Sequence, residues 1–91
     1  MRITPEERLR FHKIVDDSID KMNSPKNKDK PHWSTIPEYI LQQMINVESA
    51  ELELAVVADL GLEEIETENF DLINFNLMMC DNLRGNKWTK A

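Results

Sequence analysis

The sequence predicts an all-α fold with three main helices per chain, two of which form a long antiparallel pair. Three observations support this class. The 91 residues include only 2 Gly and 4 Pro, the Val, Ile and Leu residues recur at helical rather than alternating spacing, and a short connection at Gly61 joins two long periodic segments. We expect one domain, divided into a helical arm (1–22), a basic loop (23–34), a helical hairpin (35–84) and a tail (85–91).

The first helix is predicted to begin at Pro5 and to end near Met22. Thr4-Pro5-Glu6-Glu7 has the form of a capping box, in which Thr4 and Glu7 each accept a hydrogen bond from the other's backbone amide. The apolar residues that follow share one helix face, so this helix is interpreted as a packing arm. They are Phe11, Ile14, Val15, Ile19 and Met22.

Two further helices are predicted after the loop. Thr35-Ile36-Pro37-Glu38 resembles a second capping box, so the second helix is expected from about residue 35 to 60, where Gly61 supplies the left-handed conformation that ends helices. The third helix is expected over 62–83, stopped by Gly85. The short connection between them requires the two helices to run antiparallel.

Two acidic pairs lie on the apolar sides of this hairpin. Glu48 and Glu51 fall within the apolar arc of the second helix, away from its polar face. Glu68 and Asp71 lie beside the aromatic and Met residues of the third helix. Residues three apart on a helix are neighbours, and a turn at Gly61 brings the two pairs to about the same level.

Four carboxylates gathered in this way require a counter-charge. At about 5 Å and an effective dielectric of about 20, each pair repels by about 3 kcal/mol. The two helices contain no Lys or Arg between Glu38 and Leu83, which leaves protonation or a bound cation. The all-oxygen ligand set favours Mg²⁺ or Mn²⁺. A single acidic pair is usually a solvated face, whereas two pairs on apolar sides at one level favour the cation.

Charge and cysteine content exclude several functions. The net charge of −6 argues against a broad nucleic-acid-binding surface, because such surfaces neutralise phosphates with Lys and Arg. The single cysteine, Cys80, cannot form an intrachain disulfide, so a reducing, cytoplasmic location is expected. No signal-like or membrane-spanning segment is recognisable, and we expect neither export nor membrane insertion.

The acidic motifs and their surroundings resemble the MazG-like all-α nucleoside triphosphate pyrophosphohydrolases, in a bacterial and phage branch of that family. Glu48-Ser49-Ala50-Glu51 and Glu68-Asn69-Phe70-Asp71 match its Glu-x-x-Glu and Glu-x-x-Asp motifs, separated here by 16 residues. Further matches are His32-Trp33 and Tyr39-Ile40-Leu41 before the first motif and the run 71–82 after the second. The resemblance covers about residues 28–86.

The resemblance implies hydrolysis of a (deoxy)nucleoside triphosphate to the monophosphate and pyrophosphate, in a homodimer or homotetramer. It implies that Glu48, Glu51, Glu68 and Asp71 hold Mg²⁺ and that Glu48 or Glu51 activates water. Exposed apolar surface on several helix sides independently favours a four-helix bundle completed by oligomerisation. Family members usually carry a Glu where this chain has Val47. A catalytically weak or inactive nucleotide- or metal-binding regulatory module is therefore the alternative, and a purely structural helical dimer a third.

Four more residues are candidates for substrate contacts, and each has a structural alternative. Trp33 can stack on a base, as the family resemblance suggests, or pack on the second helix as a hydrophobic staple. Phe75 can also stack on a base, or it can be a core aromatic residue. Asn82 can bond phosphate, sugar or base, or be an ordinary polar position. Lys30, with the two other lysines of the loop, can meet the triphosphate or belong to a solvated loop.

Overall fold

The computed structural model describes residues 1–86, which contain helices and turns but no strand. Its elements follow in the order α1 (Pro5–Met22), η1 (Pro25–Asn27), η2 (Trp33–Thr35), α2 (Glu38–Val57) and α3 (Leu62–Leu83), where η1 and η2 are short 3-10 helices. The predicted all-α class with three main helices is confirmed for these residues. Residues 87–91 of the predicted tail lie outside the described residues.

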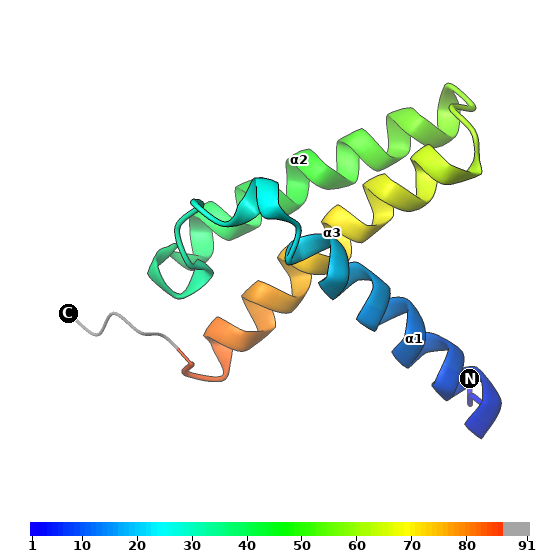
Figure 1. The fold of residues 1–91 in the computed structure, drawn as a ribbon, viewed down its shortest axis with the longest axis horizontal. Helices are drawn as coiled ribbons and strands as arrows, with labels where there is room; N and C mark the ends of the chain where they lie inside the picture. The colour runs from blue at the N-terminus through cyan, green and yellow to red at the C-terminus, as the bar shows by residue number, and fades with distance from the viewer. Residues whose placement is uncertain (87–91) are drawn as a thin grey trace.

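The start of α1 is the capping box that the sequence predicts. The Thr4 hydroxyl accepts from the Glu7 amide at 3.1 Å, and the Glu7 carboxylate accepts from the Thr4 amide at 2.8 Å. Pro5 occupies the first turn, where its missing N–H leaves no bond unmade. From its contact with α3, α1 extends away from the helix pair, so that its N-terminal half projects from the molecule (Figure 1).

The predicted capping box at the start of the second helix is wrong. α2 begins at Glu38, and Thr35 instead lies in η2, where its hydroxyl donates to the His32 carbonyl at 2.7 Å. The cause is Pro37, because a proline disfavours helical conformation in the residue before it. Ile36 is accordingly extended, with φ −96° and ψ 122°. The helix can begin only after this position.

The connection between α2 and α3 is longer than predicted, because α2 already ends at Val57. The left-handed residue that closes this helix is Asp59 (φ 51°), and the prediction of Gly61 for that role is wrong. The amides of Asp59 and of the next residue bond to the carbonyls of Val56 and Ala55, each at 3.1 Å, which is a Schellman motif. Gly61 caps the start of α3 with φ 92° and ψ 157°, a conformation essentially restricted to glycine.

α2 and α3 form the predicted antiparallel pair (Figure 1). They lie close together at the connection and diverge toward their other ends, where η2 packs against α3. α3 ends at Leu83 as predicted, with Gly85 left-handed at φ 85°. None of the helices within residues 1–86 combines the length and apolar character needed to cross a membrane.

The apolar core of the described chain is thin. Leu41 and Ala55 are its buried apolar residues, while many large apolar side chains remain exposed. On α1 the predicted packing face is largely uncovered at Phe11, Ile14 and Ile19. The exposed large apolar residues of α2 are Tyr39, Val47, Leu54, Val56 and Val57. Each chain therefore carries more apolar surface than its own helices cover.

Candidate metal centre and adjoining cleft

Three of the four predicted acidic ligands come together between α2 and α3. Glu48 on α2 and Glu68 and Asp71 on α3 each offer one carboxylate oxygen, and these three oxygens lie within 4.8 Å of one another. Glu48 lies nine residues before the end of α2 and Asp71 nine residues after the start of α3, which sets them level across the connection. All three side chains are half-buried. We call these residues the acidic group.

Glu51, the fourth predicted ligand, is exposed and lies outside the acidic group. The expectation that it lies level with Glu68 and Asp71 assumed a turn centred on Gly61. Because α2 ends earlier, Glu48 takes that position, one helical turn before Glu51. Glu51 still neighbours Glu48 and raises the pKa of that carboxyl, after burial, by hydrogen bonding and by charge.

Two oxygens of the acidic group lack partners. Oε2 of Glu48 and Oε2 of Glu68 are each buried and accept no hydrogen bond. A buried carboxylate oxygen without a partner costs free energy, because it has lost water and gained nothing in return. A cation coordinated by these carboxylates would compensate for this cost. The donor set, three carboxylates with no Cys or His, fits a hard ion such as Mg²⁺ or Mn²⁺.

The acidic group is short of positive charge. The pKa of Glu48 is raised from 4.5 to about 7, first by burial, then by Glu51, and then by the charges of Asp71 and Glu68. The pKa of Glu68 is also raised, mainly by burial and next by the charges of Glu51 and Asp71. Both shifts mean that a proton is held more tightly here than on an isolated carboxyl. A divalent cation would relieve the same deficit.

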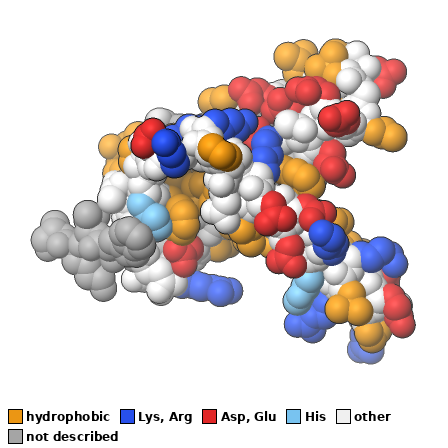
Figure 2. Space-filling view, viewed as in Figure 1, with side chains coloured by type: hydrophobic (Ala, Val, Ile, Leu, Met, Phe, Trp, Pro, Cys, Tyr) orange, Lys and Arg blue, Asp and Glu red, His pale blue; other side chains and the backbone are white. Residues whose placement is uncertain are grey.

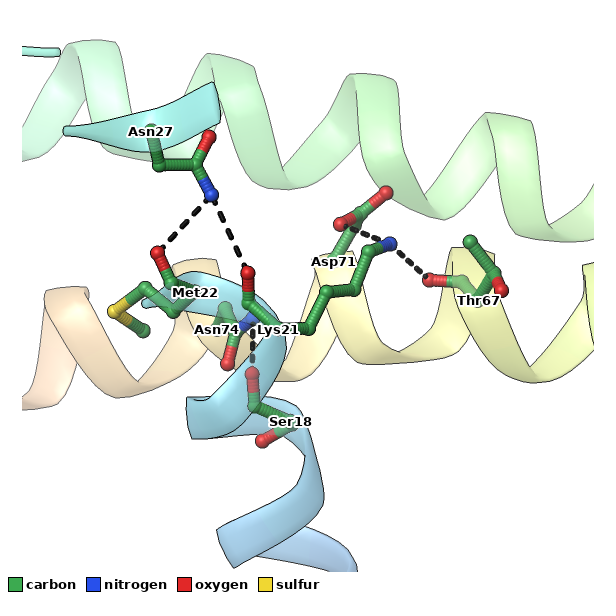
Figure 3. A network of polar contacts seen from close by, with 7 residues as sticks. All are labelled: Ser18, Lys21, Met22, Asn27, Thr67, Asp71 and Asn74. Atoms are coloured by element: carbon green, nitrogen blue, oxygen red, sulfur yellow. Dashed lines mark hydrogen bonds and ion pairs between the residues drawn. The ribbon is translucent and has the colours of Figure 1, made fainter. Parts of the chain in front are cut away.

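One cation does reach the acidic group, and the sequence analysis missed it. Lys21, in the last turn of α1, places Nζ 2.7 Å from Oδ1 of Asp71 and donates to the Thr67 carbonyl at 3.0 Å (Figure 3). Its side chain is only 20% exposed. The sequence search for a counter-charge was confined to the hairpin, whereas Lys21 arrives from another helix. The sequence feature that could have indicated Lys21 is its position as a basic residue in the last turn of the amphipathic first helix.

The end of α1 is fixed beside Asp71 by two asparagines. Asn74, buried one turn after Asp71, donates from Nδ2 to the Ser18 carbonyl at 2.8 Å. Asn27 donates from its own Nδ2 to the carbonyls of Met22 at 3.0 Å and Lys21 at 3.4 Å, which satisfies the exposed end of the helix (Figure 3). The side of α3 that carries Asn74 is therefore covered by α1.

A cleft of about 1130 Å³ adjoins the acidic group. Glu48, Asp71 and Lys21 contribute to its wall. The loop contributes three exposed lysines, and the same cleft is bordered by aromatic rings. These residues are Lys26, Lys28, Lys30, His32, Trp33 and Phe75. Figure 2 shows Lys side chains gathered over the loop next to acidic side chains of the helix pair. Positive charge, aromatic surface and carboxylates thus meet in one cavity.

The structure places three of the four predicted substrate contacts at this cleft, namely Lys30, Trp33 and Phe75. Asn82 is not among the lining residues. It is 2% exposed, and its Nδ2 donates to the carbonyls of Trp33 at 2.9 Å and Ile36 at 3.4 Å. Asn82 therefore holds η2 against α3, and with it Trp33, which lines the cleft.

Trp33 is held in place by two contacts of its own. Its indole N–H donates to Oδ2 of Asp81 at 2.8 Å. Its ring stacks on His32, with ring centroids 3.8 Å apart. Trp33 lines the cleft, and its polar contacts outside η2 are with α3, so its expected packing as a hydrophobic staple on the second helix stays a prediction.

No family model, curated protein or solved structure matches the chain. Function is therefore inferred from the residues of the site and their geometry.

Proposed function

We propose that this protein hydrolyses a (deoxy)nucleoside triphosphate to the monophosphate and pyrophosphate, with Mg²⁺ or Mn²⁺ held by the acidic group, as a MazG-like enzyme. The observation that carries this proposal is the position of Glu48 and Asp71 on the wall of a cleft that also presents lysines and aromatic rings. Such a cleft offers ligands for a hard cation, charge for phosphates and flat surfaces for a base.

In this proposal Glu48, Glu68 and Asp71 are the inner ligands, and the exposed Glu51 completes the set through water. A divalent ion held by these residues would polarise the phosphate and lower the pKa of a coordinated water. Glu51, which neighbours Glu48 but has no oxygen in the acidic group, would accept the proton from the attacking water. Attack at the α-phosphorus breaks its bond to the bridging oxygen, and pyrophosphate leaves with that oxygen.

The nucleotide is proposed to lie along the cleft. The cation would bridge its phosphates to the acidic group. The loop lysines, Lys30 among them, would balance the remaining negative charge of the phosphates. The base lies against Phe75 or the stacked pair of His32 and Trp33. Stacking of a base on an aromatic side chain contributes roughly 1–3 kcal/mol and tolerates different bases.

We also propose that two copies pair through α2 and complete a four-helix bundle. The accessible surface is 7099 Å², whereas a folded monomer of 10.7 kDa is expected to expose about 5500 Å². The excess is similar to what one subunit contributes to an obligate dimer interface. Four exposed small or apolar residues of α2 follow the 3-4 spacing of a helix-pairing seam. They are Val47, Ala50, Leu54 and Val57.

The hydrolase proposal is tested by pyrophosphate release from a panel of nucleoside triphosphates with Mg²⁺. We expect release from at least one nucleotide, and a loss of at least about 100-fold in Glu48→Gln, because a ligand and its charge are removed. Glu53→Gln is the matched control, since Glu53 is an exposed glutamate on the same helix outside the acidic group. No release from any nucleotide, with metal still bound, would overturn hydrolysis.

A second candidate is a nucleotide-binding module that does not turn its ligand over. The position of Glu51 outside the acidic group and the presence of Val47 next to Glu48 both favour it. Calorimetric binding of a nucleotide with Mg²⁺, without product after prolonged incubation, would select this candidate. Release of pyrophosphate that depends on Glu48 would exclude it.

A further inference from the structure

Lys21 stands where the acidic group meets the lysine-bearing wall of the cleft. It is anchored on α1, contacts Asp71 at 2.7 Å and the Thr67 carbonyl at 3.0 Å, and contributes to the cleft wall. The loop lysines are exposed, whereas the Lys21 side chain is largely covered. Lys21 is therefore the cation of the described residues that the fold positions most closely against the acidic group.

The backbone of Lys21 is fixed on both sides. Asn74 holds Ser18 one turn earlier, and Asn27 bonds to the carbonyl of Lys21 itself. The position of the ammonium group is thus set by the packing of α1 on α3 rather than by a free loop. A group held in this way loses little conformational freedom when it binds a ligand.

Lys21 bonds to Oδ1 of Asp71, and its charge weakens this carboxylate as a ligand of a divalent cation, because the ammonium and the cation repel each other at this distance. An ammonium has three donors, and in this structure two of its acceptors are Asp71 and Thr67. When Asp71 binds a cation instead, Lys21 keeps its hydrogen bond to the Thr67 carbonyl and has N–H donors available for a ligand in the cleft. A phosphate oxygen carried by that cation is the acceptor with the right charge.

We propose that Lys21 is a phosphate-binding residue that exchanges Asp71 for a phosphate oxygen when a divalent cation and its polyphosphate occupy the cleft. This inference rests on the proposed function. It adds that in the metal-free protein the Lys21 ammonium neutralises Asp71 in place of the cation. Lys21 opposes binding of the metal alone and favours binding of the metal with polyphosphate. The two effects have opposite signs, which a merely structural residue would not produce.

The test compares wild type, Lys21→Gln, Lys21→Arg and Lys13→Gln by calorimetry, first with Mn²⁺ alone and then with inorganic tripolyphosphate at saturating Mn²⁺. Lys21→Gln removes the charge but keeps a donor for the Thr67 carbonyl, so α1 can stay docked. Lys13 is the matched control, because it lies on the same helix in an exposed pair with Asp17 at 2.6 Å. Circular dichroism verifies that all four proteins have the same helix content.

We expect Lys21→Gln to bind Mn²⁺ alone about 5-fold more tightly and tripolyphosphate about 10-fold more weakly. Lys21→Arg should approach wild type, and Lys13→Gln should match it. If Lys21→Gln matches Lys13→Gln while wild type binds both ligands, the role of Lys21 is refuted and the proposed function stands. If Mn²⁺ binding weakens, Lys21 is structural and the inference also fails. If wild type binds neither ligand, both the proposed function and this inference are refuted.

Discussion

Trp33 and Asp81 connect the segment before α2 to the C-terminal part of α3, since the indole N–H donates to Oδ2 of Asp81 at 2.8 Å. The next residue, Asn82, donates to the carbonyl of the same tryptophan at 2.9 Å. Two successive residues of α3 therefore hold both the side chain and the backbone of Trp33. The aromatic part of the cleft depends on these contacts as well as on the residues that line it.

Replacement of Asn82 should destabilise the protein and loosen the cleft. In Asn82→Ala the carbonyls of Trp33 and Ile36 lose the hydrogen bonds that Asn82 donates, so we expect the free energy of unfolding to fall by about 1–3 kcal/mol. Asn76→Ala is the control, because Asn76 is exposed and its donor reaches only Leu72 of its own helix. Urea denaturation measures both. Equal stability of the two variants would contradict a structural role for Asn82.

Stability of the metal-free protein should depend on pH through Glu48. The pKa of this carboxyl is raised from 4.5 to about 7 in the folded state, so the folded protein binds the extra proton more tightly than the unfolded chain. The resulting stabilisation is complete below about pH 4.5 and is lost as the pH rises through about 7. Thermal unfolding in EDTA between pH 5 and pH 8 measures this loss.

Glu48→Gln supplies the control for that pH dependence. It removes the titrating group, so the fall in melting temperature between pH 5 and pH 8 should become smaller. Saturating Mg²⁺ should act in the same direction, because the cation stabilises the ionised carboxylate that the proton otherwise neutralises. The role of Glu48 would be contradicted if the wild-type melting temperature did not fall over this pH range. It would also be contradicted if the melting temperature of Glu48→Gln fell by as much as that of wild type.

Pairing of chains should depend on Leu54. This residue is 64% exposed and lies in the seam proposed on α2, so Leu54→Glu should weaken a dimer by at least about 100-fold. Val56→Glu is the matched control, because Val56 is similarly exposed, at 54%, on another side of the helix. Sedimentation equilibrium should give a dimer or larger assembly for wild type and Val56→Glu. A monomeric wild type would refute pairing.

The parts of the fold that were predicted correctly depend on local chemistry. The capping box of Thr4 and Glu7 and the left-handed Gly85 are decided by neighbouring residues, and both are observed. The start of α2 was misplaced because Pro37 acts on Ile36 more strongly than the capping pattern acts on Thr35. These errors are local, and the antiparallel pair survives them.

The site was only partly predictable for a different reason. The helical spacing brings Glu48, Glu68 and Asp71 together, but a turn that begins a few residues early moves Glu51 out of the group. The contact of Lys21 with Asp71 joins residues 50 positions apart. Such a contact depends on how α1 docks against α3, and the periodicity of either helix says nothing about that.

The central claim is that the acidic group binds a divalent cation, and anomalous diffraction from a crystal soaked in Mn²⁺ tests it most directly. We expect one strong anomalous peak between α2 and α3, about 2.0–2.3 Å from carboxylate oxygens of Glu48, Glu68 and Asp71, as Mg²⁺-like coordination requires. Glu48→Gln should weaken this peak. A crystal in which the three carboxylates are accessible to solvent, yet carry no peak at saturating Mn²⁺, would contradict the claim.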